Sequence, residues 1–293
     1  MQDKLYLGID AGGTRCRARL ADENLNTLAE HQGGAANINL EGGEPAYRAI
    51  LELVPPLLDK AGLGEDAAGR IYAGFGMAGA HLPSAKEEFA ARDYPFAGVI
   101  VYNDVETARA GAHEGADGAV LIMGTGSSGL AQVDGKLLPV AGWGYHISDL
   151  ASGAILGREL ARYAVLAQDD LVPGSPLTRA VIDHLGGSCE TAMDWSFNAW
   201  PKDFASLVPM IFDYLERNDP IAFEMITMQL KSVDVFANWF RVRGVKKLCT
   251  VGGLGERLHP VLDERYGNDF MARPKADAQH GALLLARARF SDN

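Results

Sequence analysis

One strand pattern occurs twice in this chain, and it constrains the fold more than any other feature of the sequence. The first copy is LYLGIDAGGTRCRARLAD, in which an apolar run from Leu5 meets a glycine turn and a second alternating run follows directly. The second copy is GAVLIMGTGSSGLAQVDGKLLPVAG, which begins at Gly118 and repeats strand, glycine–threonine loop, strand, polar turn and strand. Identity between the copies is low, so the repeat is architectural and predicts two related halves.

The two halves are expected to be the two domains of an α/β protein. We place an N-terminal domain at 1–117 and a C-terminal domain at 118–293, whose closing helix, ADAQHGALLLARARF, could also pack back on the first domain. Periodicity and turn signals predict strands at 5–10, 15–21, 27–32, 71–75, 99–102, 119–123, 129–133, 136–140 and 247–251. They predict helices at 45–61, from 83, from 104 to 114, at 149–167, from 220 to 243 and from 252 onward.

The composition narrows the class of function. The chain has 293 residues, of which 47% are apolar, and a formal net charge of −11. This acidity argues against a nucleic-acid partner, which needs clustered Lys and Arg, but a nucleotide ligand stays open because Mg²⁺ and backbone N–H groups can meet its charge. The three cysteines match no zinc or disulfide spacing, and we find no signal peptide and no membrane-spanning run. We expect a cytoplasmic protein without a membrane partner.

The two glycine turns contain hydroxyl side chains, and the first also contains a carboxylate, which a simple turn does not require. Backbone N–H groups at such turns bind anions, and Gly12 and Gly13 would let the backbone approach a phosphate closely. Thr14 and Thr125 can donate hydroxyl hydrogen bonds, whereas Asp10 would repel phosphate and suits Mg²⁺. Neither turn is a Walker loop or a dinucleotide fingerprint. Each turn alone could be only a tight turn, but its presence in both halves favours a phosphate site. The candidates in the second turn are Gly124, Thr125, Gly126 and Ser127.

Two further segments are candidates for acceptor chemistry. Asp104 follows an apolar strand and precedes a helix, where its carboxylate could accept the proton of an attacking hydroxyl or simply cap the helix. The segment AGWGYHISDLASG suits sugar binding, with the ring of Trp143 or Tyr145 against the sugar. On the residues alone, an ordinary loop with a core Trp, in which Asp149 caps the next helix, is the favoured interpretation. For Asp104, position alone leaves the two roles equally open.

Together these segments resemble a known family. GIDAGGT, GTGSS and TVGGLGERLHPVL are similar to the two phosphate loops and the adenosine loop of the actin, heat-shock chaperone and sugar kinase superfamily. The order of Asn37, GFGMAG, YNDVETA, IMGTGS, GWGYHISD and DAQHGALLLA resembles N-acetylglucosamine kinases, bacterial glucosamine kinases and the wider BadF/BadG/BcrA/BcrD ATPase family. The resemblance implies two ribonuclease-H-like (actin-like ATPase) domains, each a mixed sheet flanked by helices, with an ATP cleft between them.

The resemblance also implies a reaction and the residues that serve it. The chain would transfer phosphate from ATP, with Mg²⁺, to glucosamine or N-acetylglucosamine at the 6-hydroxyl, with Asp104 as the catalytic base. The nucleotide and metal site would contain Asp10, which organises Mg²⁺, Thr14 and Thr125 on the phosphates, and Gly252 and Gly253 beside adenosine. The sugar site would contain Asn37, Asp104, Gly142, Trp143, Gly144 and Asp149.

Departures and alternatives accompany this resemblance. The family often has Asp-Glu-Gly-Ser-Gly where this chain has DLASG at 149–153, so the sugar contacts there stay open. The zinc motif of another sugar kinase branch is absent, and no structural zinc is expected. One alternative is an ATPase that activates a partner enzyme through a cysteine-held cluster at a dimer interface, which the scattered cysteines disfavour. The other is a non-catalytic sugar or nucleotide sensor, which Asp10 and Asp104 disfavour. The choice between the two amino sugars and the assembly as a homodimer stay open.

Overall fold

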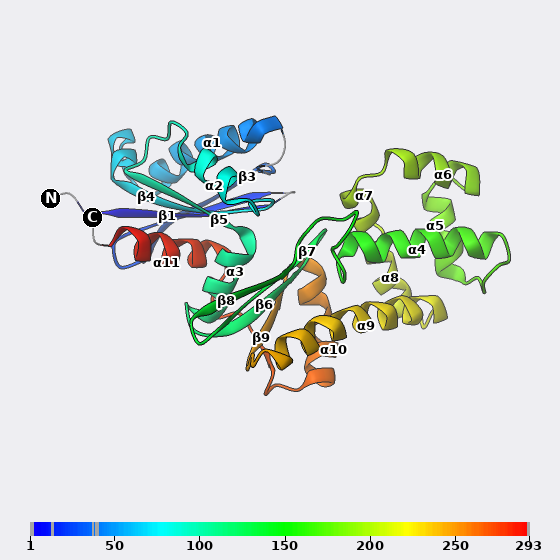
Figure 1. Ribbon diagram of the computed structural model, residues 1–293. Helices are drawn as coiled ribbons and strands as arrows, with labels where there is room; N and C mark the ends of the chain where they lie inside the picture. Colours follow the sequence, from blue (N-terminus) through cyan, green and yellow to red (C-terminus); the bar gives the residue numbers. More distant parts are fainter. Residues whose placement is uncertain (1–2, 13–14, 37, 39–40, 292–293) are drawn as a thin grey trace. The chain divides into compact units, whose positions relative to one another are not determined.

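The computed structural model describes residues 3–12, 15–36, 38 and 41–291, and it forms two compact units. Unit 1 comprises Met1–Val120, Asp134–Lys136 and Arg273–Asn293, and unit 2 comprises Leu121–Val133 and Leu137–Ala272. Each unit contains a five-stranded sheet accompanied by helices (Figure 1). The expected α/β class, with two sheets flanked by helices, is confirmed. Of the described helices, none is long and apolar enough to cross a membrane.

The sheet of unit 1 is mixed and has the strand order β3-β2-β1-β4-β5. The first three strands form antiparallel pairs, whereas β1, β4 and β5 run parallel to one another. The strands are β1 (Leu5–Ala11), β2 (Cys16–Ala21), β3 (Thr27–Gly33), β4 (Ile71–Met77) and β5 (Gly98–Asn103). All five were predicted to within about two residues, because their apolar runs end at glycine or polar turns.

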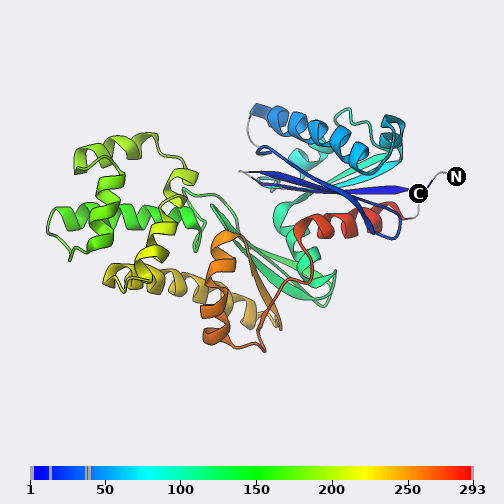
Figure 2. The ribbon, with the colours of Figure 1, turned by 180° about the vertical axis from the view of Figure 1, so that it is seen from behind.

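Helices cover both faces of this sheet. On one face, α1 (Glu44–Lys60) packs on β2 and β3 and buries Ile50, Leu53 and Leu57 against the core. On the other face lie α3 (Asp104–His113) and α11 (Ala278–Phe290), as the two opposite views show (Figures 1 and 2). The short helices η1 (Glu41–Gly43), η2 (Glu65–Arg70) and α2 (Pro83–Ala90) complete the unit.

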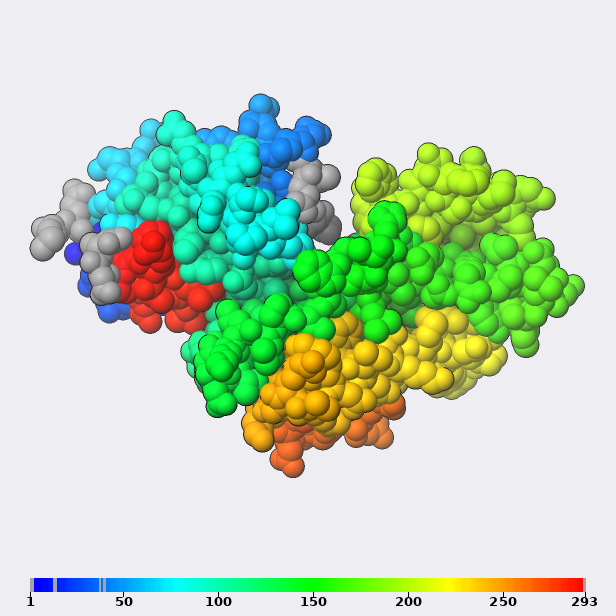
Figure 3. All heavy atoms as spheres, viewed as in Figure 1, coloured from blue at the N-terminus to red at the C-terminus, as the bar shows by residue number. Residues whose placement is uncertain are grey.

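The C-terminal helix α11 belongs to unit 1 although it is the last element of the chain. Figure 3 shows its red atoms among the blue and cyan atoms of the first 120 residues. It crosses α3 at two glycines: a Cβ on Gly111 would overlap the backbone of Asp277, and a Cβ on Gly281 would overlap that of Thr107. Arg19 of β2 donates two hydrogen bonds, of 3.1 and 2.7 Å, to the carboxylate of Asp277, the N-cap of α11.

The sheet of unit 2 has the order β10-β9-β6-β7-β8. Its strands are β6 (Gly118–Met123), β7 (Ser127–Val133), β8 (Lys136–Ala141), β9 (Leu248–Val251) and β10 (Met271–Ala272). Its helices are α4 (Gly153–Gln168), α5 (Pro176–His184), α6 (Cys189–Asn198), α7 (Pro201–Ala205), α8 (Val208–Leu215), α9 (Pro220–Val242) and α10 (Gly253–Tyr266). Asp219 caps α9 through the N–H groups of Ile221 and Ala222, as its sequence DP predicts. Its other carboxylate oxygen accepts from Leu177 N–H at 3.0 Å and so ties α5 to α9.

Candidate functional site

In unit 1, the candidate residues lie where three parallel strands end. The register places Asp10 of β1 beside Gly76 of β4, and Gly76 beside Tyr102 of β5. Asp10 on β1 and Asp104, just past the end of β5, therefore lie at the same edge of the sheet, with β4 between the two strands. The carboxyl ends of parallel strands are where open α/β sheets bind ligands. Gly13, Thr14 and Asn37 lie outside the described residues.

The loop after β1 is fixed to the segment after β3. Gly12 N–H donates to Arg15 C=O at 3.0 Å, and Gly12 C=O accepts from Ala36 N–H at 3.1 Å. The chain that leads toward position 37 therefore lies beside the first glycine loop. This contact joins Gly12 of the predicted phosphate loop to Ala36 within unit 1.

Asp10 is held by a basic residue that the sequence analysis did not single out. Arg17, its register partner on β2, donates to Asp10 Oδ2 through Nη2 at 2.6 Å and through Nε at 3.2 Å. Among the described residues, no group of three or more His, Cys, Asp or Glu side chains could enclose a metal ion. Asp10 nevertheless fits Mg²⁺, which commonly takes one or two carboxylates and completes its shell with phosphate and water.

Asp104 is the first residue of α3, and the helix cap is its neighbour Asn103. Asn103 and Glu106 form a capping box, in which Glu106 Oε2 accepts from Asn103 N–H at 2.7 Å. Asp104 Oδ1 accepts from Val105 N–H at 2.7 Å, so its carboxylate lies at the positive end of α3. The interpretation of Asp104 as the helix cap is therefore wrong, because the residue that caps α3 is Asn103.

A polar network that the sequence analysis missed surrounds this strand–helix junction. Asn103 Nδ2 lies 2.8 Å from His81 Nδ1, and Lys86 Nζ forms an ion pair with Glu106 Oε2 at 2.5 Å. Burial, with a smaller effect of the Lys86 charge, lowers the pKa of His81. The sequence signal for the capping box was present in the Asn103–Glu106 spacing, whereas nothing local indicated that His81 would reach Asn103.

In unit 2, the second glycine loop (residues 124–127) joins β6 to β7 and is anchored to helix α4. Gly153 N–H donates to Gly124 C=O at 2.8 Å, and Ala154 N–H donates to Thr125 C=O at 3.1 Å. Two of the N–H groups that a helix start leaves without intrahelical partners are thus used to hold this loop. Among the four loop residues, Gly124 has open space where a Cβ would lie.

The loop that contains Trp143 (residues 142–151, the Trp143 loop) lies directly against the second glycine loop. Asp149 accepts hydrogen bonds from the N–H groups of Gly144, at 3.2 Å, and Ser127. A Cβ on Gly126 would lie 2.9 Å from Asp149 Oδ2, so a larger residue there would displace that carboxylate. Burial raises the pKa of Asp149, and its two backbone hydrogen bonds partly offset that effect.

Helix α4 begins later than its sequence predicts. The expected start was Asp149, but the helix starts at Gly153 and Ser152 is its cap, accepting from Ile155 N–H at 3.1 Å. Asp149 and Ala151 instead have left-handed backbone, with φ of 56° and 69°. Such backbone costs about 1–2 kcal/mol for each residue with a Cβ. The N-capping interpretation of Asp149 is therefore wrong, and its carboxylate joins the two loops.

Ser127 contributes its side chain to the same junction. Its hydroxyl donates to Leu150 C=O at 2.6 Å, and the residue is only 4% exposed. The predicted contact of Ser127 with a phosphate stays a prediction, and its hydroxyl already has a protein partner. The sequence did not indicate this hydrogen bond between Ser127 of the second glycine loop and Leu150 of the Trp143 loop.

The Trp143 loop presents one aromatic ring to solvent and anchors another. Trp143 is 68% exposed and lies between Gly142 and Gly144, whose φ values of 80° and 95° favour glycine. Tyr145 is stacked on Phe204 of α7, with ring centroids 5.8 Å apart. The loop is therefore fixed at Tyr145, whereas most of the Trp143 side chain is exposed to solvent.

The predicted adenosine loop also reaches the second glycine loop. Gly252 follows β9 with φ of 86°, and a Cβ there would lie 2.7 Å from Met123 C=O, at the end of β6. Only glycine fits this approach. Gly253 starts α10 and has open space where a Cβ would lie. Unit 2 thus brings together Gly124–Ser127, Gly142–Gly144, Asp149 and Gly252–Gly253.

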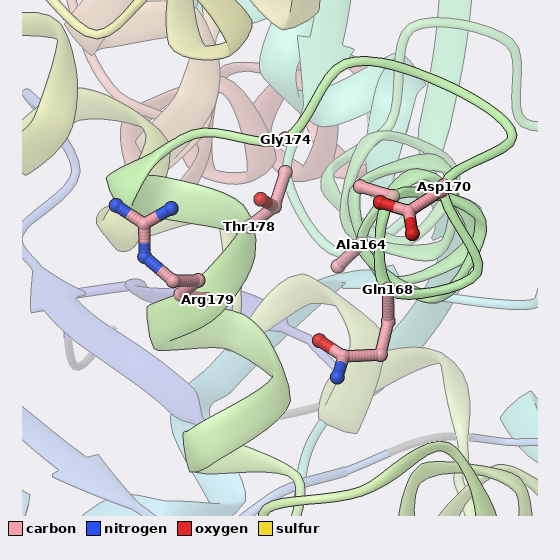
Figure 4. A pocket seen from close by; sticks show the side chains of 7 residues that line it. Ala164, Gln168, Asp170, Gly174, Thr178 and Arg179 are labelled. Atoms are coloured by element: carbon pink, nitrogen blue, oxygen red, sulfur yellow. The ribbon is translucent and has the colours of Figure 1, made fainter.

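A separate hollow of about 280 Å³ lies among the helices of unit 2 (Figure 4). Its lining comes from α4, α5 and the segment between them: Ala164, Ala167, Gln168, Asp170, Gly174, Thr178 and Arg179. None of these is a predicted site residue.

Known proteins are similar to this chain in sequence and in fold over nearly its whole length. Glucosamine kinase GspK of Vibrio cholerae is 34% identical over 281 residues, which cover 96% of this chain and 95% of that protein. N-acetyl-D-glucosamine kinase of Dictyostelium discoideum is 25% identical over an alignment of 317 positions, which covers 98% of each chain. The crystal structure of a proposed N-acetylglucosamine kinase from Chromobacterium violaceum has a TM-score of 0.88 and 32% identity, covering 97% of this chain and 99% of that one.

The match to a family model extends from residue 7 to residue 286, and so includes both sheets and most of α11. The resemblance seen in the short motifs is therefore confirmed at the scale of the whole chain. This chain belongs to the BadF/BadG/BcrA/BcrD ATPase family.

Proposed function

We propose that this protein is an ATP-dependent amino-sugar kinase that phosphorylates glucosamine or N-acetylglucosamine at the 6-hydroxyl. The observation that carries the proposal is the 34% identity to a glucosamine kinase over 96% of the chain. The similarity to an N-acetyl-D-glucosamine kinase supports the same substrate class. The positions of the candidate residues at strand ends and helix starts agree with it.

Asp104 is the proposed catalytic base. It would accept the proton of the sugar hydroxyl as that oxygen attacks the terminal phosphorus of ATP and ADP leaves. The network of Asn103, Glu106 and Lys86 would keep the start of α3 in place. In phosphoryl transfer the protein forms few covalent bonds with the substrates. Its main contributions are to orient the reacting groups and to neutralise charge.

The nucleotide would be held by backbone and hydroxyl groups of the glycine loops. Open space at Gly124 and Gly253 would let ATP approach the main chain. Mg²⁺, when bound, would neutralise phosphate charge, and Asp10 would help to hold it while Arg17 fixes the carboxylate. The contacts of Thr14 and Thr125 with phosphate belong to this proposal.

Asp104 and residues of the Trp143 loop are the proposed contacts of the amino sugar. Trp143 offers an exposed apolar face, and Asp149 offers a buried carboxylate beside Gly144. The proposed sugar residues also include Asn37 and Gly142. Glucosamine carries a cationic amine that a carboxylate would attract, whereas N-acetylglucosamine carries a neutral acetamide.

The alternative, an ATPase that activates a partner through a cysteine-held cluster, is not favoured. Cys16 and Cys249 are fully buried. Burial raises the pKa of Cys16 to about 12 and that of Cys249 to about 11, so both stay protonated thiols. Cluster ligation needs thiolates that can reach the cluster.

A coupled assay of ADP release tests the proposal. With ATP and Mg²⁺, we expect turnover with glucosamine or N-acetylglucosamine to exceed that with glucose, mannose and galactose. The difference between the two amino sugars in kcat/KM then identifies the substrate. ADP release that does not depend on any sugar would instead support a partner-activating ATPase.

A further inference from the structure

The Trp143 loop ends in backbone that depends on its contacts. Asp149 and Ala151 both have left-handed φ values although neither is glycine. Left-handed backbone is unfavourable for any residue with a Cβ. The loop therefore keeps its path only where neighbouring groups hold it.

Two side chains from outside the loop hold successive carbonyl groups of this turn. Ser127 of β7 donates to Leu150 C=O at 2.6 Å. Gln229 of α9 donates through Nε2 to Ala151 C=O at 2.7 Å, across 78 residues of sequence. Ser127 belongs to the second glycine loop itself, so Gln229 is the support that comes from a distant element.

Gln229 stands out among the buried residues of its helix. It is 2% exposed, and its buried neighbours along α9 are Met225, Ile226, Val233 and Phe236, all apolar. A buried amide is unfavourable unless it forms hydrogen bonds, and an apolar residue of the same size would suit this face of the helix. The amide is thus explained by its bond to Ala151.

From these contacts we infer that Gln229 is a positioning residue of the kinase reaction, holding Ala151 so that Asp149 stays in place between Gly144 and Gly126. This inference rests on the proposed function, because it assigns Asp149 to the sugar site. Gln229 is itself buried, so we do not assign it a contact with either substrate. It acts through the loop, and its loss would displace the carboxylate that joins the Trp143 loop to the second glycine loop.

The direct test is Gln229→Leu, which keeps the approximate volume and removes the donor. We expect KM for the preferred amino sugar to rise about tenfold, the effect of losing one buried hydrogen bond. KM for ATP should change less than twofold, because Gly153 and Ala154 still anchor the second glycine loop. Equal changes in both KM values, or no change in either, would overturn the inference.

Two further variants separate positioning from general loss of stability. Met225→Ala truncates a neighbouring buried side chain, and it should lower the melting temperature without changing the ratio of the two KM values. Ala151→Gly removes the penalty of left-handed backbone, so in the Gln229→Leu protein it should recover part of the sugar affinity. Absence of any recovery would count against a role through the loop backbone.

Hydrogen exchange measured without substrate distinguishes this inference from the proposed function. In Gln229→Leu, amides of residues 142–152 should exchange faster than in the parent, while those of β1 and β4 should not change. If the parent phosphorylates no amino sugar, the proposed function fails whatever the exchange result. If it does and the exchange of residues 142–152 is unchanged in the variant, the inference about Gln229 alone fails.

Discussion

At the scale of single residues, the side chains proposed for chemistry are bound to groups of the protein itself. Asp104 accepts from Val105 N–H, Asp10 is paired with Arg17, and Asp149 accepts from two loop N–H groups. These contacts orient each carboxylate before a ligand arrives. Such preorganisation is what phosphoryl transfer requires of a protein.

The first prediction concerns the base. Asp104→Asn should keep the start of α3, because Asn103 and Glu106 cap it, and should lower kcat by about 10²–10⁴-fold. Asp66→Asn, the same change at an exposed acid in the first turn of η2, should leave kcat unchanged. Turnover of Asp104→Asn within a few-fold of the parent, in a protein with unchanged circular dichroism, would remove Asp104 from the role of base.

The second prediction concerns the nucleotide. Gly124→Ala meets no protein atom, so the variant should fold normally and yet bind ATP at least about tenfold more weakly, through the loss of one or more bonds to phosphate. Isothermal titration calorimetry measures this. Gly69→Ala, also in open space but in η2, is the matched control and should bind ATP like the parent. An unchanged ATP affinity in Gly124→Ala would place the phosphates elsewhere.

At the scale of elements, the sequence predicted strands well and helix starts less well. Strands such as β1 and β6 end at glycine turns that are visible in the sequence. The start of α4 was misplaced by four residues because Asp149, Leu150 and Ala151 carry no glycine to signal left-handed backbone. Tertiary contacts from Ser127 and Gln229 hold that turn. The sequence of residues 149–151 does not indicate these contacts, because their partners lie elsewhere in the chain.

The third prediction concerns the end of α3. His113 is buried, its Nε2–H donates to Ala119 C=O at 2.9 Å, and burial lowers its pKa below 6.5. Below that pH the unfolded chain binds a proton that the folded state does not bind, so the free energy of unfolding falls as the pH falls. Urea midpoints should therefore decrease from pH 7.5 to pH 5.5.

The matched variant for this effect is His113→Gln, which cannot titrate. Its urea midpoint should depend less on pH over the same range, with a residual slope from His81, whose pKa is also lowered. Parallel pH dependence in the parent and the variant would show that His113 is not the group responsible.

At the scale of the whole molecule, a repeated strand pattern was enough to predict two α/β halves. The sequence analysis allowed α11 to pack back on the first domain, but it did not identify α3 as the partner, which lies more than 160 residues earlier. In the structure, small residues make the contact: Gly111 and Gly281 let the two helices meet backbone to backbone. The contacts of the Trp143 loop with the second glycine loop could not be predicted from the sequence either, because they join separate segments of the chain.

The fourth prediction tests this helix crossing. Gly281→Ala places a Cβ against the backbone of Thr107, and overpacking of this kind typically destabilises by about 1–3 kcal/mol. Urea unfolding should show the loss. Ala288→Ser adds one atom at an exposed position of α11 and should leave the midpoint unchanged. A parent-like midpoint for Gly281→Ala would mean that α11 does not pack closely on α3.

Identification of the product tests the proposed function most directly. The purified protein is incubated with ATP, Mg²⁺ and glucosamine or N-acetylglucosamine, and phosphorus NMR follows the terminal phosphate. We expect a sugar 6-phosphate signal to grow as ATP is consumed, in equal amount to ADP, and to be nearly absent with Asp104→Asn. Release of inorganic phosphate with no sugar phosphate, in a preparation that consumes ATP, would contradict an amino-sugar kinase.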